Sequence, residues 1–584
     1  KLVVLTVGLA LLVSLACSSA PAAPVAPVEV IKEVEVIKEV EVVKEVEVIK
    51  EVIKEVEVAV PAVATAGAVE KPGKLGGMLK VGGYAKPKHF DIQQSTTVNN
   101  LMPQGYIYNT LLKFTAESDG AEIGPDLASG WEVSDDGKDY TFDLREGVTF
   151  HDGSAFTAAD VVATYDRIIN PPEGVLSMRQ YMFGDVTGVS AIDDTTVKFS
   201  LTKPQVTFAK NVASGWNVIY SKENLEANDF NLRETGLEAP GTGPFKIGDY
   251  EIGEYYGTVK FVDYWDEGKP YLDGVTHYKM GNEATKLAAL MAGEIDVAIP
   301  IPPADEAMIK KSHPEILTSH VAYFNFTLFQ FNQNRPPFDD VRVRRAILLG
   351  YDQVTGNYSD TSWMCGTTGG WMPQACQMGQ WDRSEAVLRG TPGFRLPTDA
   401  DIAEAKQLLK DAGFAESSTI KILGRGTKSG DSFAFQADHL SRVLDINVEV
   451  EGVDSSTFYD LATAGDFDVA LFGGGGTAFD DPSEIWDKYL LPGAGQNYGN
   501  FDNAAITQRL SDIRGEFDEA KRRQLVMDTH ELLDEHVPYI PSRWQGRVFA
   551  WSSDVKGLAP DPRIIAGLYN APVMRAWEWA WLDR

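Results

Sequence analysis

Residues 473–482 have the composition of a ligand-binding loop. Their sequence, GGGGTAFDDP, places four consecutive glycines before a threonine and two aspartates before a proline. Glycines let a backbone approach a ligand closely and leave its N–H groups uncovered by side chains. A phosphate-binding loop is an alternative, but the lysine and the helix that follow the glycines of such loops are missing after Thr477. Asp480 and Asp481 also suit a turn and a helix cap before a helix at 483–490.

Aromatic side chains can add stacking surfaces to such a site. Trp363, Trp371 and Phe479 are the three that we expect to line a binding cleft, where they would stack on sugar rings or peptide groups. Most of the other tryptophans are expected in the core or between domains.

The sequence offers little for catalysis. Its 8 histidines form no HExxH motif, and no GxSxG or CxxC motif occurs. The acidic pairs 135–136, 339–340 and 480–481 are adjacent residues in turns, whereas two carboxylates that flank a bond come from separated positions. We therefore expect neither an enzyme nor a metal site. The net charge of −31 also argues against nucleic-acid binding, because such a surface repels phosphate backbones.

Cys365 and Cys376 are separated by ten residues that are rich in glycine and turn formers. In an exported protein this pair predicts a disulfide that closes a surface loop. Closing so short a loop stabilises a fold by about 2–3 kcal/mol in the chain-entropy model. Two unpaired thiols are one alternative, and a metal site that also uses neighbouring methionines is another.

The N-terminal segment predicts export. Leu2 to Ala16 is an apolar run of 15 residues, which suits a signal-peptide core and is short for a membrane span. The run ends in SLAC, so Cys17 stands where a lipoprotein signal is cleaved, although Ser14 replaces the usual aliphatic residue. We expect residues 1–17 to be a lipoprotein signal peptide and Cys17 to carry the lipid anchor. A free cysteine in a discarded signal peptide is the alternative.

Residues 28–58 repeat the hexapeptide VEVIKE with small variations. A period of six advances about 240° per repeat on an α-helix, so the valines and isoleucines would wind around its whole surface. In an extended chain valines fall on one side, and the density of β-branched residues favours this conformation. We expect residues 18–75 to be a low-complexity tether, either an ordered stalk or a disordered linker. In either form, residues 28–58 can associate laterally between copies.

The elements before the glycine loop alternate between helix and strand. We expect a helix that begins after Thr398, and the strands and helices that follow it are expected at 419–423, 431–443, 446–450, 457–464 and 467–472. Such alternation requires a mainly parallel sheet with helices on both faces. Ligands bind at the carboxyl ends of the strands in these sheets, so the loop after Phe472 is the expected site.

Residues 125–167 form the most informative segment. Tyr140, Phe142 and Leu144 alternate with polar residues, as in a strand with one buried face. Thr157 is expected to cap a helix that has Asp160 at its third position. This segment closely resembles the signature of the family 5 bacterial solute-binding proteins that serve peptide-type ABC importers. The shared patterns are LA-x-x-W-x-V, D-G-x-x-Y-T-F and G-V-x-F-H-D-G, followed farther along by GTGPF, A-L-x-x-G-E-I-D and HVPYIP.

This resemblance covers about residues 76–584 and implies a fold. The expected class is α/β, periplasmic-binding-protein-like type II, with two lobes, a hinge and an extra domain. The expected bounds are 76–118, 235–310 and 545–584 for the first lobe, 119–234 for the extra domain and 311–544 for the second lobe. The implied mechanism is hinge closure, in which a ligand contacts both lobes and selects the closed form. No cofactor is implied, because ATP hydrolysis belongs to partner subunits.

The resemblance also implies the site. In peptide-binding members the glycine loop carries an aromatic residue, and an aspartate four residues before the proline pairs with the α-amino group of the peptide. Alignment on Pro482 places Gly475 and Ala478 at these two positions. A buried ammonium needs a charge partner, so this pocket suits a bulkier or uncharged ligand, unless Asp480 replaces the missing carboxylate. The expected ligand contacts are Trp363, Trp371, Gly475, Gly476, Ala478, Phe479 and Asp480.

Three functions follow. The first is the substrate-binding component of an ABC importer, which captures peptide-like solutes and delivers them to a permease with its ATPase subunits. The second is the same role for an oligosaccharide or another uncharged solute. The third is a surface sensor or scaffold that assembles through the repeat. In each case we expect an extracytoplasmic lipoprotein, in the periplasm or on the outer face of the cell membrane, that is held to the membrane by its lipid alone.

Overall fold

The computed structural model describes residues 42–43, 46–47, 73–83, 89–95, 98–114, 123–352, 371, 381–414, 418–425, 430–473, 481–558 and 576–584. The chain divides into two compact units, Lys1–Ala64 and Thr65–Arg584. In the first unit, strands β1 (Val42–Val43) and β2 (Val46–Glu47) lie within the hexapeptide repeat and pair antiparallel.

A mixed sheet of ten strands organises the second unit. Its strand order is β10-β11-β12-β3-β13-β18-β14-β17-β15-β16. The strands are β3 (Met78–Gly83), β10 (Phe245–Glu251), β11 (Tyr255–Lys260), β12 (Gly274–Lys279), β13 (Val297–Ile301), β14 (Ile316–Phe331), β15 (Thr419–Arg425), β16 (Asn447–Val453), β17 (Val469–Gly473) and β18 (Tyr539–Ser552).

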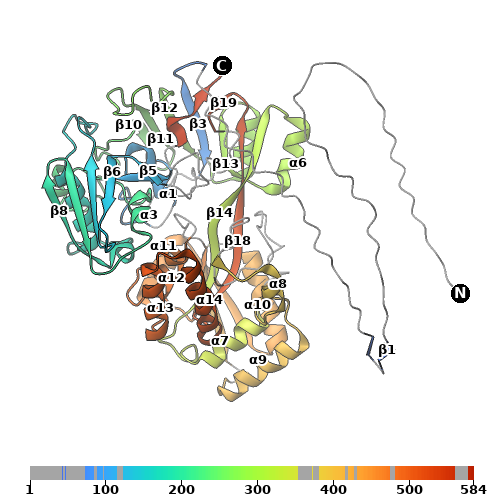
Figure 1. Cartoon of the computed structure of the whole chain (residues 1–584). Coiled ribbons are helices and arrows are strands. Elements are labelled where there is room, and N and C mark those ends of the chain that lie inside the picture. Colours follow the sequence, from blue (N-terminus) through green and yellow to red (C-terminus); the bar gives the residue numbers. More distant parts are fainter. Residues whose placement is uncertain are drawn as a thin grey trace. The chain divides into compact units, whose positions relative to one another are not determined.

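The two longest strands, β14 and β18, run side by side through the middle of this sheet (Figure 1). They pair antiparallel from Ile316 opposite Ser552 to Gln330 opposite Tyr539, and the register shifts near the middle of the pair, between Ala322 and Asn325. At one end β18 also pairs with β13, and at the other end β14 pairs with β17. We call β14 and β18 the crossover ribbon, because they join the two halves of the sheet.

The predicted alternation of helix and strand before the glycine loop is confirmed. Strand β15 pairs in parallel with both β16 and β17. The helix predicted after Thr398 begins at Asp399, and the side chains of Thr398 and Asp401 form a capping box. The helices of this half are α7 (Val341–Gly350), α8 (Glu385–Gly390), α9 (Asp399–Asp411), α10 (Gly430–Leu444), α11 (Ser455–Ala464), α12 (Pro482–Leu490), α13 (Ala504–Gly515) and α14 (Glu519–His536).

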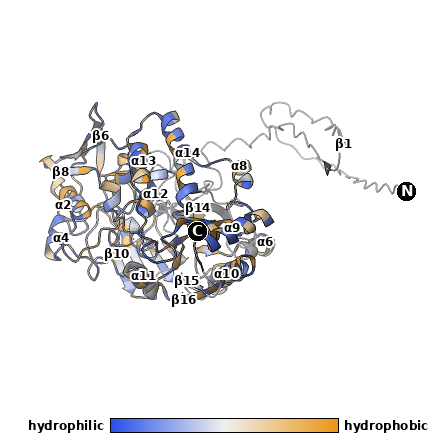
Figure 2. Cartoon of the chain, turned by 90° about the horizontal axis from the view of Figure 1, so that it is seen from below, coloured by the Kyte–Doolittle hydropathy of each residue, from blue (hydrophilic) through white to orange (hydrophobic). Residues whose placement is uncertain are grey.

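Two strands of the signature segment, β6 and β7, join β9 and β8 in a separate antiparallel sheet of four strands in the order β6-β7-β9-β8. Tyr140, Phe142 and Leu144 are buried on β7 as predicted, and helix α2 begins at Ala158 after its Thr157 cap. Helix α2 carries both hydrophilic and hydrophobic turns (Figure 2), and its Val161 and Tyr165 are buried. The elements of this region are β6 (Ala128–Val133), β7 (Asp139–Leu144), α2 (Ala158–Ile169), η2 (Gln180–Phe183), β8 (Val186–Asp193) and β9 (Thr196–Leu201).

The remaining elements are short or flank the sheets. They are α1 (Val98–Leu101), η1 (Gly105–Ile107), β4 (Leu112–Phe114), β5 (Ile123–Pro125), α3 (Phe208–Ala213), α4 (Lys222–Ala227), α5 (Glu283–Met291), α6 (Pro303–Ser312), β19 (Val555–Lys556), η6 (Ala576–Glu578) and β20 (Trp581–Leu582). Within the described residues, no helix combines the length and the apolar character needed to cross a bilayer.

Buried apolar side chains form two large clusters. The first core draws its residues from 79–299 and 549–582, and the second core draws its residues from 328–540. The first core combines strands from one end of the ten-stranded sheet with the four-stranded sheet and helix α2, and the second core is built on the other end of the ten-stranded sheet. Strand β18 of the crossover ribbon contributes to both cores.

Candidate ligand-binding site

The chain on both sides of the predicted binding loop is held firmly in the second core. Strand β17 ends at Gly473 and lies between β14 and β15. Helix α12 begins at Pro482, and Asp481 caps it by accepting a hydrogen bond from the Ser483 N–H at 3.0 Å. Both carboxylate oxygens of Asp481 also accept hydrogen bonds from Arg522 at 2.7 and 2.6 Å. The predicted helix cap is thus confirmed for Asp481.

Most of the predicted ligand contacts cannot be placed. Trp363, Gly475, Gly476, Ala478, Phe479 and Asp480 lie outside the described residues, as do Cys17, Cys365 and Cys376. Their roles in binding, lipidation and disulfide formation stay predictions.

Trp371 is the described member of the predicted set, and it lies in the second core. It is 1% exposed, and its ring packs edge-on against Phe394 and Tyr539 at centroid distances of 5.3 and 5.4 Å. Its indole N–H donates to Asp534 at 2.6 Å, and its carbonyl oxygen accepts from the Tyr539 hydroxyl at 2.9 Å. These contacts fix the position of Trp371, while its contact with a ligand stays a prediction.

Helix α12, which follows the loop, is buried along all nine residues. Such complete burial is unusual for a helix with the sequence PSEIWDKYL, because it carries three charged side chains. Each charge has a partner: Asp487 forms an ion pair with Arg514 of α13 at 2.8 Å, and Glu484 lies 3.4 Å from Lys488, one turn along the same helix. Burial raises the pKa of Asp487 to about 7, although Arg514 opposes this shift.

The same helix meets residues that belong to the first core. The Tyr181 hydroxyl of η2 lies 3.5 Å from a carboxylate oxygen of Glu484. Arg514, on α13, bridges Asp487 and Asp185, and its distance to Asp185 is 3.4 Å. We call the contacts of residues 179–206 with residues 481–517 the inter-core seam.

Two backbone and surface contacts extend the inter-core seam. The Val206 N–H donates to the carbonyl oxygen of Arg514 at 2.9 Å. The Lys203 ammonium donates to the Ser511 hydroxyl at 2.9 Å. The seam therefore joins the two cores at a place other than the crossover ribbon.

The acidic pair 339–340 and Arg344, which follows it on helix α7, have structural roles. Asp340 caps α7 by accepting from the Arg342 N–H at 2.8 Å. Arg344 is buried and donates to four backbone carbonyls, which belong to Phe338, Asp339, His536 and Val537. Among the described residues, no group of three or more His, Cys, Asp or Glu side chains is arranged to hold a metal ion.

The sequence patterns do not predict which residues form the inter-core seam. The spacing of Glu484 and Lys488, four residues apart directly after the predicted loop, was the available signal, and this spacing also fits an ordinary surface pair. Nothing near Tyr181 or Asp185 in the sequence indicates that they meet Glu484 of α12 and Arg514 of α13.

Comparisons with known proteins agree with the earlier resemblance. The family model described as "Bacterial extracellular solute-binding proteins, family 5 Middle" matches residues 122–497. Di/tripeptide-binding protein 1 of Pseudomonas aeruginosa is 26% identical over 487 residues, which cover 78% of this chain and 86% of that protein.

Two solved structures have a similar fold. The binding protein AgaA from A. tumefaciens R10, in complex with agropinic acid, has a TM-score of 0.75 at 24% identity, covering 87% of this chain and 99% of that chain. The periplasmic binding protein DppA from Helicobacter pylori, in complex with the peptide STSA, has a TM-score of 0.73 at 24% identity, covering 88% of this chain and 99% of that chain. Both likenesses support the predicted type II periplasmic-binding fold.

Proposed function

Because this chain belongs to the family 5 bacterial extracellular solute-binding proteins, we propose that it is the substrate-binding component of an ABC importer for peptide-like solutes. The observation that carries this proposal is the match to the family over residues 122–497. The relative from Pseudomonas aeruginosa, a di/tripeptide-binding protein, supports peptides as the class of ligand. The protein itself would bind without changing its ligand, and the partner permease and ATPase would move the solute and hydrolyse ATP.

The crossover ribbon is the proposed hinge. The ribbon contributes to both cores, and the register of its two strands shifts near its middle. Strands bend most easily at a register shift of this kind. The inter-core seam would form when the lobes close, because it joins first-core residues to helix α12. A ligand that contacts both sides would then favour the closed form through its differential affinity.

The division into lobes remains part of this proposal. We assign 76–118, 235–310 and 545–584 to the first lobe, 119–234 to the extra domain and 311–544 to the second lobe. The second core, at 328–540, falls inside the last of these ranges. A lipid on Cys17 would hold the protein at the membrane, and residues 18–75 would serve as its tether.

An uncharged solute is the second candidate. It is favoured by Gly475 and Ala478, which stand where peptide-binding relatives have an aromatic residue and an aspartate.

Calorimetric titration of the full chain separates these candidates. We expect saturable binding to one or more members of a panel of di- to pentapeptides, together with a smaller radius of gyration in X-ray scattering at saturation. N-acetylated copies of the same peptides lack the charged α-amino group. Because Ala478 offers that group no carboxylate, the acetylated peptides should bind as tightly as the free amines. Binding of oligosaccharides without binding of peptides would favour the second candidate. Chemical turnover of a bound peptide would contradict a pure binding role.

A further inference from the structure

Arg514 is shared between two carboxylates that come from different cores. Its Nη1 lies 2.8 Å from Oδ2 of Asp487, on α12 of the second core, and its Nε lies 3.4 Å from Oδ2 of Asp185, which follows η2 in the first core. The side chains of Asp487, Arg514 and Asp185 are 4%, 13% and 18% exposed. At this point of the inter-core seam, one largely buried cation therefore meets two anions.

The carboxylate of Asp487 is only partly satisfied. Its Oδ1 has no hydrogen-bond donor among the described residues. A buried anionic oxygen without a donor is costly, and a second carboxylate on the same guanidinium repels the first. A proton on Asp487 would remove both costs. Burial raises the pKa of Asp487 to about 7; Arg514 opposes this shift, and the charges of Asp481 and Asp185 add to it.

The other ionisable groups around α12 have partners or stay neutral. Asp481 pairs with Arg522 of α14, and Glu484 pairs with Lys488. The remaining groups on the elements that pack against α12 and α13 are Arg179 and Tyr181 beside η2, Lys203, which donates to Ser511, and His530 of α14. Burial raises the pKa of Tyr181 well above its usual value and lowers that of His530 to about 4, so both stay neutral near pH 7. Asp487 is therefore the group on which we centre a change of charge near neutral pH.

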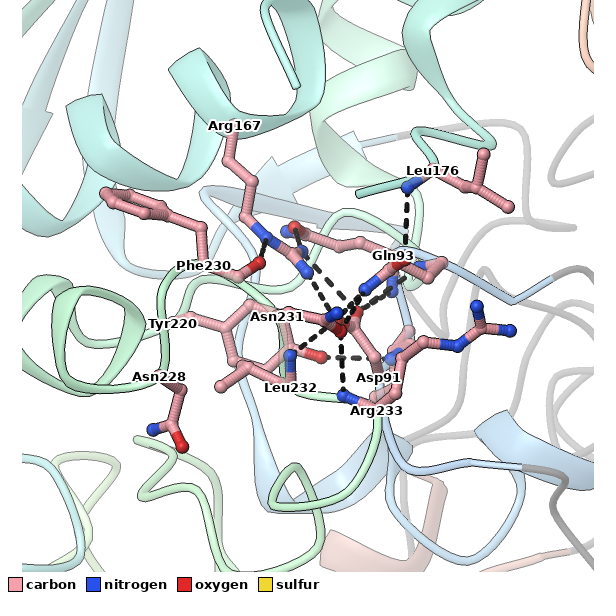
Figure 3. A network of polar contacts seen from close by, with 12 residues as sticks. Asp91, Gln93, Arg167, Leu176, Tyr220, Asn228, Phe230, Asn231, Leu232 and Arg233 are labelled. Carbon is pink, nitrogen blue, oxygen red and sulfur yellow. Dashed lines mark hydrogen bonds and ion pairs between the residues drawn. The ribbon is translucent and has the colours of Figure 1, made fainter. Parts of the chain in front are cut away.

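The segment that carries Asp185 is fixed to the first core by a buried polar network. Asp91 forms an ion pair with Arg167 of α2 at the centre of this network (Figure 3). Gln94 donates to Asp91 at 2.9 Å, and its side-chain oxygen accepts a hydrogen bond from the Leu176 N–H at 3.0 Å. The network thus holds the chain that leads into η2. Asp185 would therefore move with the first core, whereas its two partners in the seam would move with the second.

We propose that Asp487 is a positioning residue that links ligand capture to protons: a neutral Asp487 leaves the Arg514 cation to Asp185 across the seam and so favours the closed form. The inference rests on the proposed function, in which the seam forms when the lobes close. Closure brings Asp185 to the shared guanidinium, so the closed form binds a proton from the solvent at Asp487 more tightly than the open form. By linkage, the proton stabilises the closed form below about pH 7, and this stabilisation is lost as the pH rises through that value. The affinity for ligand should therefore rise in acid.

Calorimetric titration of the full chain at about pH 5.5 and about pH 8 measures this linkage. The probes are N-acetylated di- to pentaalanines, whose single carboxylate stays ionised over this range. With the wild type we expect about tenfold tighter binding at the lower pH, because each unit by which closure raises a pKa can change the affinity up to about tenfold. Titrations in buffers with different ionisation enthalpies count the protons, and we expect a net uptake when the peptide binds near neutral pH.

Two substitutions should remove the pH dependence with opposite effects on affinity. Asp487→Asn replaces the acid by a neutral group of the same shape, so its binding at the higher pH should be as tight as that of the wild type in acid. Asp185→Asn removes the carboxylate across the seam, so the weaker binding of the wild type at the higher pH should persist in acid. Asp512→Asn, at an exposed position of α13, is the matched control and should keep the wild-type pH profile. Circular dichroism establishes that each variant is folded.

The outcomes separate the proton linkage from the proposed function. A purely structural role of Asp487 predicts weaker binding by Asp487→Asn at both pH values, and that result would overturn the linkage. Equal affinity of the wild type at both pH values would also overturn it, while peptide binding itself would stand. Absence of binding by every peptide at both pH values would overturn the proposed function together with the linkage.

Discussion

The imidazole of His151 is hydrogen bonded to the backbone of Gly241, although the two residues lie in sequence motifs that are far apart. The Gly241 N–H donates to Nδ1 of the His151 ring at 3.3 Å, and the backbone N–H of His151 donates to the Gly241 carbonyl at 2.9 Å. On its other side, Nε2 of His151 lies 3.0 Å from the carbonyl oxygen of Gly243. The ring must therefore accept at Nδ1 and donate from Nε2, which requires the neutral form. The contact joins the F-H-D-G and GTGPF motifs into one structural unit.

The neutral form of His151 predicts a loss of stability in acid. Burial lowers the pKa of His151 to about 4, whereas an imidazole in an unfolded chain titrates near its ordinary value of about 6.5. Between these values the unfolded chain binds the additional proton. The stabilisation is therefore fully present above about pH 6.5 and is lost as the pH falls toward 4.

Urea unfolding of the wild type and of His151→Gln at pH 7.5, 6 and 5 measures this contribution. The variant should be less stable at pH 7.5, and the difference should shrink on acidification. His277 and His530, whose pKa values burial also lowers, are present in both proteins and so cancel from the comparison. Parallel pH curves for the two proteins would contradict the assignment.

Gly241 is required for close packing of backbone on backbone. A Cβ atom added at Gly241 would lie 2.1 Å from the carbonyl oxygen of Ile107, which cannot move as a flexible side chain would. We expect Gly241→Ala to lower the free energy of unfolding by about 1–3 kcal/mol or more. Gly188→Ala is the control, since an added Cβ there would meet nothing within 4 Å, and its effect should stay within about 0.5 kcal/mol. Equal denaturation midpoints for the two variants would show that the close approach is not important.

Local patterns in the sequence predicted the local structure well. The alternation at Tyr140 and Phe142, the Thr157 cap and the strand that ends at the glycine loop depend on neighbours within a few residues, where propensity and periodicity act directly. The bounds of the helices differ by a residue or two because helix ends fray. The two-lobed fold came from the family motifs and not from periodicity.

Local patterns in the sequence could not predict the inter-core seam. Tyr181 meets Glu484, and Asp185 meets Arg514, across two cores that the crossover ribbon connects, and that topology is set by pairing between strands far apart in sequence. A charged stretch such as PSEIWDKYL has the composition of an exposed helix. Its complete burial follows from partners that local sequence does not contain.

The ion pair of Arg167 and Asp91 should be needed for stability. Both side chains are buried, and Asp91 also accepts hydrogen bonds from the backbone N–H groups of Gln93 and Leu232. Arg167→Met leaves the carboxylate without its cation, so we expect a loss of about 3–5 kcal/mol in guanidinium unfolding.

A second substitution and an exposed pair provide the controls for this prediction. Adding Asp91→Asn to Arg167→Met should recover part of the loss, because the unpaired charge is removed. Lys198→Met breaks the half-exposed pair with Asp139 and should cost at most about 1 kcal/mol. A loss at Arg167 no larger than that at Lys198 would contradict a role for burial.

Asp185 provides a way to weaken the inter-core seam without disturbing either core. Asp185→Asn removes one of the two carboxylates that contact Arg514, and Arg514 keeps its partner Asp487 in the second core. Because Asp185 and Arg514 are partly exposed, the stability of the ligand-free protein should change by less than about 1 kcal/mol. If closure makes this contact, the same energy is lost from the closed form alone, and peptide affinity should fall by up to about fivefold.

Calorimetry and X-ray scattering test this expectation together. Asp185→Asn should need more peptide to reach the compact state but should reach the same radius of gyration at saturation, because the hinge and the binding residues are intact. Lys406→Met, which breaks an exposed pair with Asp445 within the second half of the chain, should leave the affinity unchanged. An identical affinity for Asp185→Asn and the wild type would mean that the seam is present in the open form as well, and the closing motion would then have to occur elsewhere in the molecule.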